Sequence, residues 1–188
     1  DGRTFWQIGD RKQNAPRPIY DLEERLRCMD EAGVDIQVVA ISPKWYLYNF
    51  IHQVPIDTSI QFARLQNDDL ARIIQAAPHR LQAFATLPLQ DIQASVTELR
   101  RALDMGFQGI IIDSVVQGQG LGNELLYPIY ELLQKNGKVL FIHPSFLPDQ
   151  RIERMGFRWM MGFCFDETYA LACLVFDGVL DQFPDLKV

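Results

Sequence analysis

One histidine follows directly after an apolar stretch that has the pattern of a buried strand. Residues 139–142 are all apolar, without polar alternation, and they lead into His143 and Pro144. Such a run is typical of a parallel strand buried on both faces, and a proline prevents it from continuing as an ordinary central strand. Parallel α/β proteins carry their chemistry at the carboxyl ends of their strands. His143 is therefore a candidate metal ligand or acid–base group, with a core histidine bonded to a backbone carbonyl as the structural alternative.

Lys44 and Trp45 close another apolar stretch and open a long aromatic loop that reaches to about residue 55. A cation and an aromatic ring could contact the carboxylate and the ring of a substrate, so both residues are candidate substrate contacts. The structural alternative is a solvated lysine whose stem covers apolar surface. His52 lies in the same loop, and Asp113 ends a further apolar run. We interpret Asp113 as a turn or hydrogen-bonding residue rather than a group that acts on substrate.

Helix and strand patterns alternate along the chain from about residue 20, which is typical of β-α units that build a parallel sheet. Asp21 and Asp91 stand where helix N-caps are expected, and Gly33, Gly106 and Gly137 stand where helices end. The predicted helices cover residues 21–33, 57–77, 91–105, 123–133 and 167–183, and the predicted strands cover residues 35–41, 81–87, 107–113 and 139–142.

We assign structural rather than functional roles to Asn67 and to the glycine-rich segment 118–120. Asn67 lies on the apolar stripe of the predicted helix 57–77, so we predict a buried amide bonded to backbone groups. Gly118 and Gly120 flank Gln119 in a glycine-rich segment that lacks the spacing of a dinucleotide fingerprint. The sequence predicts a surface turn there rather than a phosphate-binding loop.

Four strands and the beginning of a fifth, at residues 185–188, cannot close an eight-stranded barrel, which takes about 250 residues. The chain has no initiator methionine, and it opens on a polar, turn-like segment. It also contains no linker or internal repeat that would divide it. We therefore predict that residues 1–188 form a single incomplete α/β domain, with both ends of a larger fold missing.

The composition limits the partners and the cell compartment. A net charge of -6 and a pI near 5.0, without a basic stripe, argue against nucleic acid as a partner. No apolar stretch approaches the roughly 20 residues of a membrane span, and no leader pattern opens the chain, so we predict no membrane partner and a cytoplasmic location. Cys28, Cys164 and Cys173 are far apart and odd in number, which favours reduced thiols.

Six short motifs follow one another along the chain: MDEAGVDIQV at 29–38, LPLQD at 87–91, GFQGI at 106–110, FIHP at 141–144, ET at 167–168 and FPDLKV at 183–188. Together they span nearly the whole chain from about residue 20, whereas residues 1–19 match weakly. In this order they resemble the amidohydrolase superfamily. Within it they are most similar to the metal-dependent decarboxylase branch typified by aminocarboxymuconate-semialdehyde decarboxylase.

The resemblance implies a (β/α)8 barrel, of which this chain would hold about strands two to five and the start of strand six. It also implies one divalent metal ion, held by a His-x-His pair, by a histidine at the end of the fifth strand and by a later aspartate. His143 matches the fifth-strand histidine by position and by its His-Pro context, while the other ligands fall outside this sequence. Zn²⁺ is the expected ion, with Mn²⁺ or Mg²⁺ as alternatives.

The resemblance further implies a non-oxidative decarboxylase that acts on a small carboxylated aromatic compound or on a ring-cleavage product. Arg158 and Trp159 follow His143 in a segment that covers the active-site mouth in this family, and they join Lys44 and Trp45 as candidate substrate contacts. The family implies a homodimer or homotetramer. Two alternatives stay open: a metal-dependent hydrolase of an ester, lactone or amide, and a noncatalytic barrel subunit.

Overall fold

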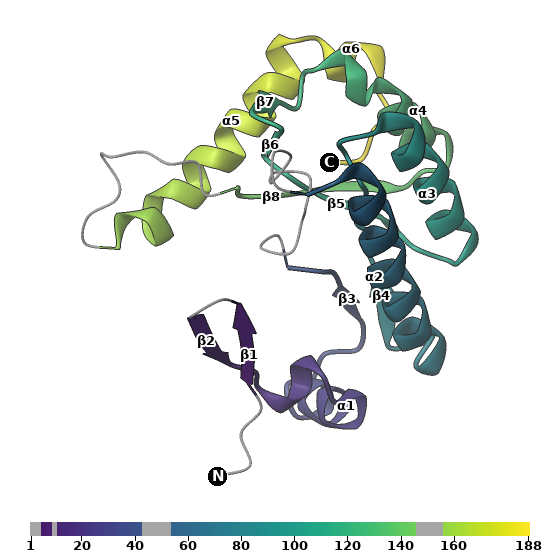
Figure 1. Cartoon of the computed structure of the whole chain (residues 1–188), viewed down its shortest axis with the longest axis vertical. Helices are drawn as coiled ribbons and strands as arrows, with labels where there is room; N and C mark the ends of the chain where they lie inside the picture. Colours follow the sequence, from purple (N-terminus) through teal and green to yellow (C-terminus); the bar gives the residue numbers. More distant parts are fainter. Residues whose placement is uncertain (1–4, 9–10, 43–53, 146–155) are drawn as a thin grey trace.

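The computed structural model of the chain describes residues 5–8, 11–42, 54–145 and 156–188, and strands alternate with helices along most of it (Figure 1). The predicted alternation is confirmed. The strands are β1 (Phe5–Ile8), β2 (Arg11–Asn14), β3 (Gln37–Val39), β4 (Leu81–Ala83), β5 (Gly109–Asp113), β6 (Val115–Val116), β7 (Gln119–Gly120) and β8 (Val139–His143). The helices are α1 (Leu22–Glu31), α2 (Ile56–Ala76), α3 (Ile92–Asp104), α4 (Tyr127–Lys135), α5 (Phe163–Phe176) and α6 (Val179–Gln182), with 3₁₀ turns at Arg17–Ile19 and Glu124–Leu126 and a π-helical turn at Arg158–Gly162.

Four strands, β3, β4, β5 and β8, follow one another in space in the same order as in the chain. β3 pairs with β4 in parallel, and β5 pairs with β8 in parallel up to the last residue pair, Asp113 and His143. Because all neighbours are parallel, the carboxyl ends of these strands meet at one edge. The parallel bridges that join the pairs into one series are Ala85↔Ile110, between β4 and β5, and Val139↔Lys187, between β8 and the last residues of the chain.

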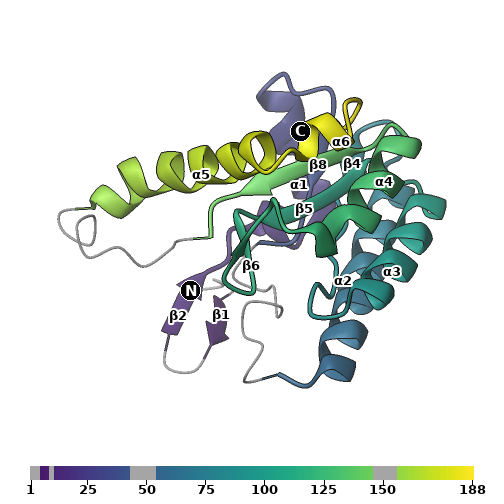
Figure 2. The same cartoon turned by 90° about the horizontal axis from the view of Figure 1, so that it is seen from above.

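Helices α2, α3 and α4 lie next to one another along one side of these strands (Figures 1 and 2). Helix α2 contacts β4, α3 contacts α4, and α4 contacts β8. Apolar residues from both layers form the core between them, and burying one such side chain fully stabilises the fold by about 1.5–3 kcal/mol. Core residues with no exposed surface include Ala83, Leu99, Ala102, Phe107, Ile110, Ile112, Ile129, Leu133 and Leu140.

Short-range signals set several of the predicted helix boundaries. The Asp21 carboxylate accepts a hydrogen bond from the backbone N–H of Glu24 over 3.1 Å, and the Asp91 carboxylate accepts one from Ala94 over 2.9 Å. Gly106 follows the end of α3 with φ of +95°, a conformation that L side chains rarely adopt. Both predicted caps are therefore confirmed.

Several segments differ from the predicted elements. The strands predicted at 35–41 and 81–87 form ladder strands only over β3 and β4, and the helix predicted at 123–133 begins as a 3₁₀ turn and continues as α4. The helix predicted at 167–183 already begins at Phe163, and Gly178, with φ of +76°, separates α5 from α6. The weakly matching amino-terminal segment contains an antiparallel hairpin of β1 and β2, which the sequence did not predict.

The glycine-rich segment turns between β6 and β7, as predicted, and it also packs closely on α5. A Cβ atom on Gly120 would lie 2.6 Å from Cys173 Sγ, and one on Gly122 would lie 1.8 Å from Asp177 Oδ2. Both distances are shorter than real Cβ contacts. The two glycines therefore allow the backbone to approach the helix, which is a packing role.

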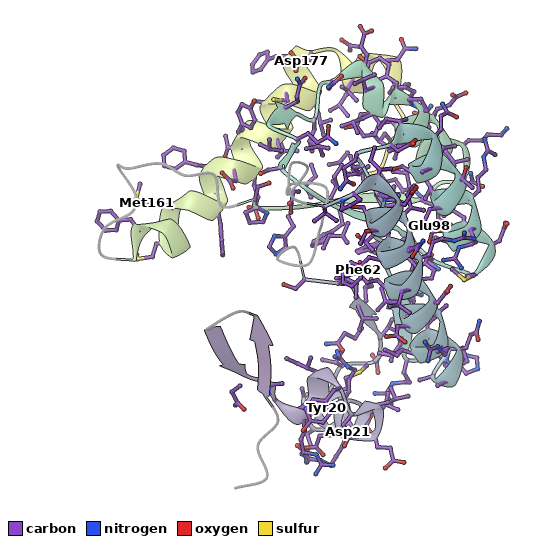
Figure 3. All side chains as sticks on the ribbon, in the orientation of Figure 1. Tyr20, Asp21, Phe62, Glu98, Met161 and Asp177 are labelled. Atoms are coloured by element: carbon purple, nitrogen blue, oxygen red, sulfur yellow. The ribbon has the colours of Figure 1, made fainter. Side chains whose placement is uncertain are left out.

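A buried polar network links α2, α3 and the chain after β4. The Asn67 side chain accepts from Thr86 N–H over 3.0 Å and donates to Thr86 O over 2.9 Å and to Glu98 Oε1 over 2.7 Å. Glu98, labelled in Figure 3, also accepts from Arg101 Nε over 2.9 Å, and this hydrogen bond to a carboxylate raises the pKa of the Arg101 guanidinium. The buried amide predicted at Asn67 is confirmed, with a carboxylate as an additional partner.

Helix α5 carries apolar side chains on every side. Ala170 and Leu174 have no exposed surface, whereas Phe176 on another side is 85% exposed. Figure 3 shows Met161 near the end of this helix that lies farthest from α6. A helix that is apolar all round is usually covered on all sides. The other large apolar residues exposed on α5 and the π-helical turn before it are Met160, Met161, Phe165, Tyr169, Leu171 and Val175.

In the part of the chain that the structure describes, no helix has the length and apolar character of a bilayer span. Cys28, Cys164 and Cys173 are all free, in agreement with the predicted thiols.

The buried hydroxyl of Tyr130 provides a first testable prediction. It donates to Leu121 O over 2.7 Å, and burial raises the pKa of Tyr130 well above its ordinary value. Tyr130→Phe leaves that carbonyl without its donor, so we expect the free energy of unfolding to fall by about 1–2 kcal/mol in urea titrations. Tyr127→Phe removes a neighbouring hydroxyl as the control, and we expect a change within about 0.5 kcal/mol. Equal losses in the two variants would contradict the assigned bond.

The raised pKa of Tyr130 also determines how the free energy of unfolding changes with pH. Above about pH 10 the phenol ionises in the unfolded chain but stays protonated in the folded one, so the unfolded state binds fewer protons. The contribution of Tyr130 is therefore complete below about pH 10 and is lost as the pH rises further. The wild-type free energy of unfolding should fall more steeply above that pH than that of Tyr130→Phe.

Candidate functional site

His143 ends β8 at the carboxyl edge of the parallel strands. Side chains alternate along a strand, so His143 shares one face with Phe141, whereas Leu140 points to the other face, into the core beneath the helices. Phe141 is 45% exposed, and its ring stacks on that of Phe84 with centroids 5.3 Å apart. His143 is half-buried. The structure therefore places the imidazole on the strand face opposite the core and helices α2–α4, next to an apolar aromatic surface.

A backbone carbonyl fixes the protonation pattern of the imidazole. His143 Nδ1 lies 2.9 Å from Pro144 O, and a carbonyl oxygen can only accept, so Nδ1 carries the proton and donates. In the neutral ring Nε2 then carries the lone pair. A histidine that binds a metal usually donates its other ring N–H to a carbonyl or carboxylate in this way. This arrangement fits a metal ligand, and it also matches the carbonyl bond of the structural alternative.

The residues that the structure describes do not complete a metal site by themselves. Among them there is no group of three or more His, Cys, Asp or Glu side chains that could hold an ion. Asp113 is the register partner of His143 and is only 3% exposed, which agrees with a structural role at the end of β5. His143 therefore fits one ligand position, and a metal ion needs further ligands from elsewhere.

The other residues singled out in the sequence are placed only in part. Lys44, Trp45 and His52 lie outside the described residues. Arg158 and Trp159 open the π-helical turn that leads into α5, and their side chains also lie outside what is described. His79, by contrast, is exposed in the turn before β4, at the edge opposite His143.

Sequence reasoning missed two serines at this edge, Ser114 and Ser145, whose side chains are hydrogen-bonded to each other. They are far apart in the chain, and each follows a strand without a recognisable motif. Only the pairing of β5 with β8 brings them together. The sequence would have indicated this serine pair only if the register of β5 against β8 had been known.

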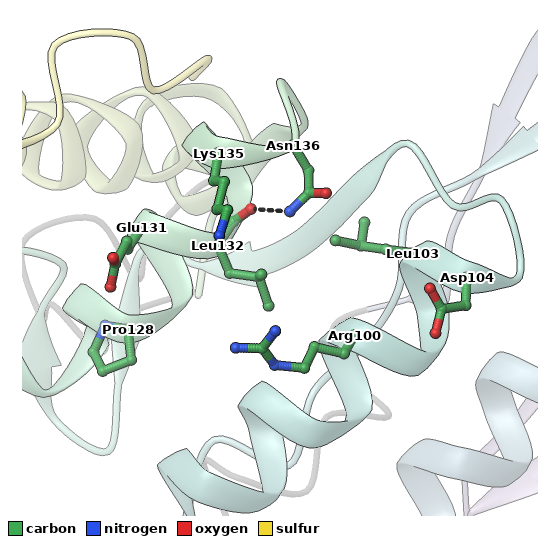
Figure 4. A pocket seen from close by; sticks show the side chains of 8 residues that line it. All are labelled: Arg100, Leu103, Asp104, Pro128, Glu131, Leu132, Lys135 and Asn136. Carbon is green, nitrogen blue, oxygen red and sulfur yellow. Dashed lines mark hydrogen bonds between the residues drawn. The ribbon is translucent and has the colours of Figure 1, made fainter.

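A groove of about 340 Å³ between α3 and α4 lies away from this edge (Figure 4). Leu103, Asp104 and Asn136 come from the helix ends that lead to the amino ends of β5 and β8, which is the edge opposite His143. Because the groove lies at this opposite edge, it is separate from the candidate site. The charged side chains that line the groove are of both signs. Its lining residues are Arg100, Leu103, Asp104, Pro128, Glu131, Leu132, Lys135 and Asn136.

Parallel strands in chain order, each followed by a helix, with a histidine at their carboxyl edge, define a protein of the (β/α)-barrel class. Residues 4–188 match the amidohydrolase family, and the chain belongs to that family. The TIM-barrel fold and the resemblance predicted from the motifs are both confirmed, and the family match includes the amino-terminal segment that resembled the family only weakly.

Three proteins to which this chain is similar are named as decarboxylases. The 2-amino-3-carboxymuconate-6-semialdehyde decarboxylase of Dictyostelium discoideum is 31% identical, over 100% of this chain and 50% of its own length. The gamma-resorcylate decarboxylase of a Rhizobium species is 28% identical, over 96% of this chain and 58% of its own. The 5-carboxyvanillate decarboxylase of Novosphingobium aromaticivorans, solved with bound manganese, is 31% identical with a TM-score of 0.79, over 90% and 49% of the two chains. The chain spans about half the length of the curated relatives it matches.

Proposed function

We propose that this chain is part of a metal-dependent, non-oxidative decarboxylase that acts on a small carboxylated aromatic compound or on a ring-cleavage product. The observation that carries the proposal is the place of His143 at the carboxyl edge, with Nδ1 bonded to a carbonyl, in a chain of the amidohydrolase family. The relatives named above act as decarboxylases, which favours this reaction over hydrolysis within the same family.

We further propose that β3, β4, β5 and β8 are strands two to five of an eight-stranded barrel, and that the residues around Lys187 begin strand six. The chain then forms one incomplete barrel domain over residues 1–188. The exposed apolar side chains of α5 and of Phe141 support this proposal, since further strands and helices would cover them. A homodimer or homotetramer, a cytoplasmic location and the lack of a nucleic-acid partner stay part of the proposal.

The proposed cofactor is one divalent metal ion, and His143 Nε2 would be one of its ligands. Such an ion supplies a Lewis acid that polarises substrate oxygens when it is bound. Zn²⁺ remains our expectation from the sequence, while the manganese in the solved relative supports Mn²⁺ equally. Both accept imidazole nitrogen, so the single ligand that this chain offers does not select between them.

The residues of this chain have separate roles in the proposed reaction. The Nδ1–H of His143 donates to Pro144 O, which leaves the Nε2 lone pair available as a ligand of the proposed metal ion. The stacked rings of Phe84 and Phe141 provide an apolar surface beside it for the substrate ring. Loss of CO2 breaks a carbon–carbon bond, leaves its electron pair on the ring carbon, and needs a proton at that carbon. Lys44, Trp45, Arg158 and Trp159 are the proposed contacts for the carboxylate and the ring.

The test uses the complete protein that contains this chain, loaded separately with Mn²⁺ and Zn²⁺. It is incubated with 2,6-dihydroxybenzoate, 5-carboxyvanillate and 2-amino-3-carboxymuconate-6-semialdehyde in D₂O. We expect one equivalent of CO2 per substrate consumed, with deuterium at the carbon that carried the carboxylate, and no reaction after the metal is removed by a chelator.

The other possible functions give different products. Release of an acid together with an alcohol or amine from ester, lactone or amide substrates, without CO2, would replace the decarboxylase by a hydrolase. A complete protein that binds no metal and converts none of these compounds would support a noncatalytic subunit. Either result would overturn the proposal.

A further inference from the structure

Two serine side chains join the ends of β5 and β8 beside His143. Ser114 directly follows β5, and Ser145 lies two residues after His143. The Ser114 hydroxyl donates to Ser145 Oγ over 2.9 Å, and the Ser145 N–H donates to Ser114 Oγ over 3.2 Å. The N–H of Val115 also donates to Ser145 Oγ over 3.1 Å. The two side chains thus hold each other and the main chain at both strand ends.

The serine pair begins where the backbone ladder between β5 and β8 ends. The Ser114 N–H donates to His143 O over 2.9 Å, which is an ordinary link between parallel strands. The next N–H on this side of the chain belongs to Ser145, and it donates to the Ser114 side chain. Ser114 has no exposed surface, so water does not replace a lost bond there without a rearrangement. Leaving such a buried group unpaired costs about 1–3 kcal/mol.

The peptide unit between Pro144 and Ser145 connects this pair to the imidazole. Its carbonyl accepts from His143 Nδ1 over 2.9 Å, and its N–H donates to Ser114 Oγ. The peptide unit is planar, so the direction of its N–H determines the direction of its carbonyl. Ser114 Oγ therefore sets the orientation of the group that fixes the His143 ring.

We propose that Ser114 is a positioning residue for His143: its hydroxyl holds the Pro144–Ser145 peptide unit, which orients the imidazole so that Nε2 faces the metal. The inference rests on the proposed function, since it needs a metal at His143. Groups behind a metal ligand keep it within about 0.5 Å of the productive geometry, and their loss lowers metal affinity about 10–100-fold.

The test compares Ser114→Ala with Ser145→Ala in the complete protein. Ser114→Ala removes the acceptor of the Ser145 N–H, whereas Ser145→Ala keeps that acceptor and removes only its own hydroxyl. We expect the Mn²⁺ dissociation constant to rise about 10–100-fold in Ser114→Ala and less than about 10-fold in Ser145→Ala. The visible spectrum of the Co²⁺-substituted protein should shift in Ser114→Ala. Ser145→Thr keeps the hydroxyl and should bind Mn²⁺ like the wild type.

Tyr130→Phe controls for a general loss of stability, because it removes a buried hydrogen bond between α4 and Leu121 O that does not involve His143 or the serine pair. We expect it to keep the wild-type Mn²⁺ affinity. A Ser114→Ala protein that is less stable but has the wild-type dissociation constant and Co²⁺ spectrum would overturn the inference. If Ser114→Ala does not fold, Ser114→Cys offers a weaker acceptor of similar size, and wild-type values in that variant would overturn it as well.

Failure of this inference can be distinguished from failure of the proposed function. A wild-type protein that binds no divalent ion would overturn both. A wild-type protein that binds Mn²⁺ and loses it in His143→Ala, while the Ser114 variants bind it normally, would overturn only the positioning role of Ser114.

Discussion

The His143→Ala variant of the complete protein is expected to release CO2 with kcat/KM lowered on the order of 10³-fold or more. The proposed role of Nε2 is to hold a divalent ion, and methyl in place of imidazole offers no lone pair. Losing one preorganised electrostatic group at a reacting centre typically costs 10²–10³-fold, and loss of the ion itself costs more. The measurement is steady-state CO2 release together with the metal content of the purified protein.

His79→Ala is the matched control for His143→Ala. His79 is exposed in the turn before β4, at the opposite edge of the strands, so its removal should leave both metal content and turnover unchanged. His143→Gln tests the ring specifically, since an amide keeps polarity and similar size but binds divalent metals poorly. Near-normal metal content and turnover in His143→Ala would remove His143 from the site.

The second large effect is expected for Gly109→Ala, which should lower the free energy of unfolding by about 4 kcal/mol or more, or prevent folding. Gly109 opens β5 with φ of +150°, and a Cβ atom there would lie 2.0 Å from Val139 O and 2.7 Å from Val139 N. These are backbone atoms of the partner strand, which cannot rotate away. Overpacking that forces the backbone itself to move is one of the few mechanisms that produce losses of this size.

Gly106→Ala provides the matched control from the same GFQGI motif. Gly106 also has a positive φ, of +95°, but a Cβ atom on it would meet nothing within 4 Å. Its substitution therefore measures the cost of the backbone conformation alone, about 1–2 kcal/mol. Urea titration of both variants separates the cost of the backbone conformation from the cost of the steric contact with Val139. A Gly109→Ala protein as stable as Gly106→Ala would contradict the close approach of β5 and β8.

Much of the fold could be predicted because its signals are local. Asp91 caps α3 through a backbone N–H only three residues away, and Gly106 ends that helix by its own conformation. The apolar run before His143 indicated a strand without knowledge of its neighbours. Its predicted burial on both faces is wrong in this structure, where Leu140 is buried but Phe141 on the other face is 45% exposed. Asn67 could be recognised as a buried amide from the spacing of one helix face.

The parts that could not be predicted depend on contacts between distant residues. Glu98 has no local signal that marks it as buried, because its partner Asn67 reaches it only through the packing of α2 on α3. Ser114 and Ser145 meet only through the register of β5 and β8. The β1–β2 hairpin has a sequence without regular alternation, so no period marked it. In each case the missing information was a register or a packing angle rather than a residue preference.

The order of the parallel strands also bears on how this protein folds during synthesis. Each strand in the series from β3 to the last residues pairs with the strand of the series made just before it, at sequence separations such as the 30 positions from Gly109 to Val139. At roughly 5–20 residues per second a ribosome delivers each new partner within about 10 seconds. The sheet can therefore grow from its amino-terminal strand while translation continues, and each unit finds a completed edge to dock on.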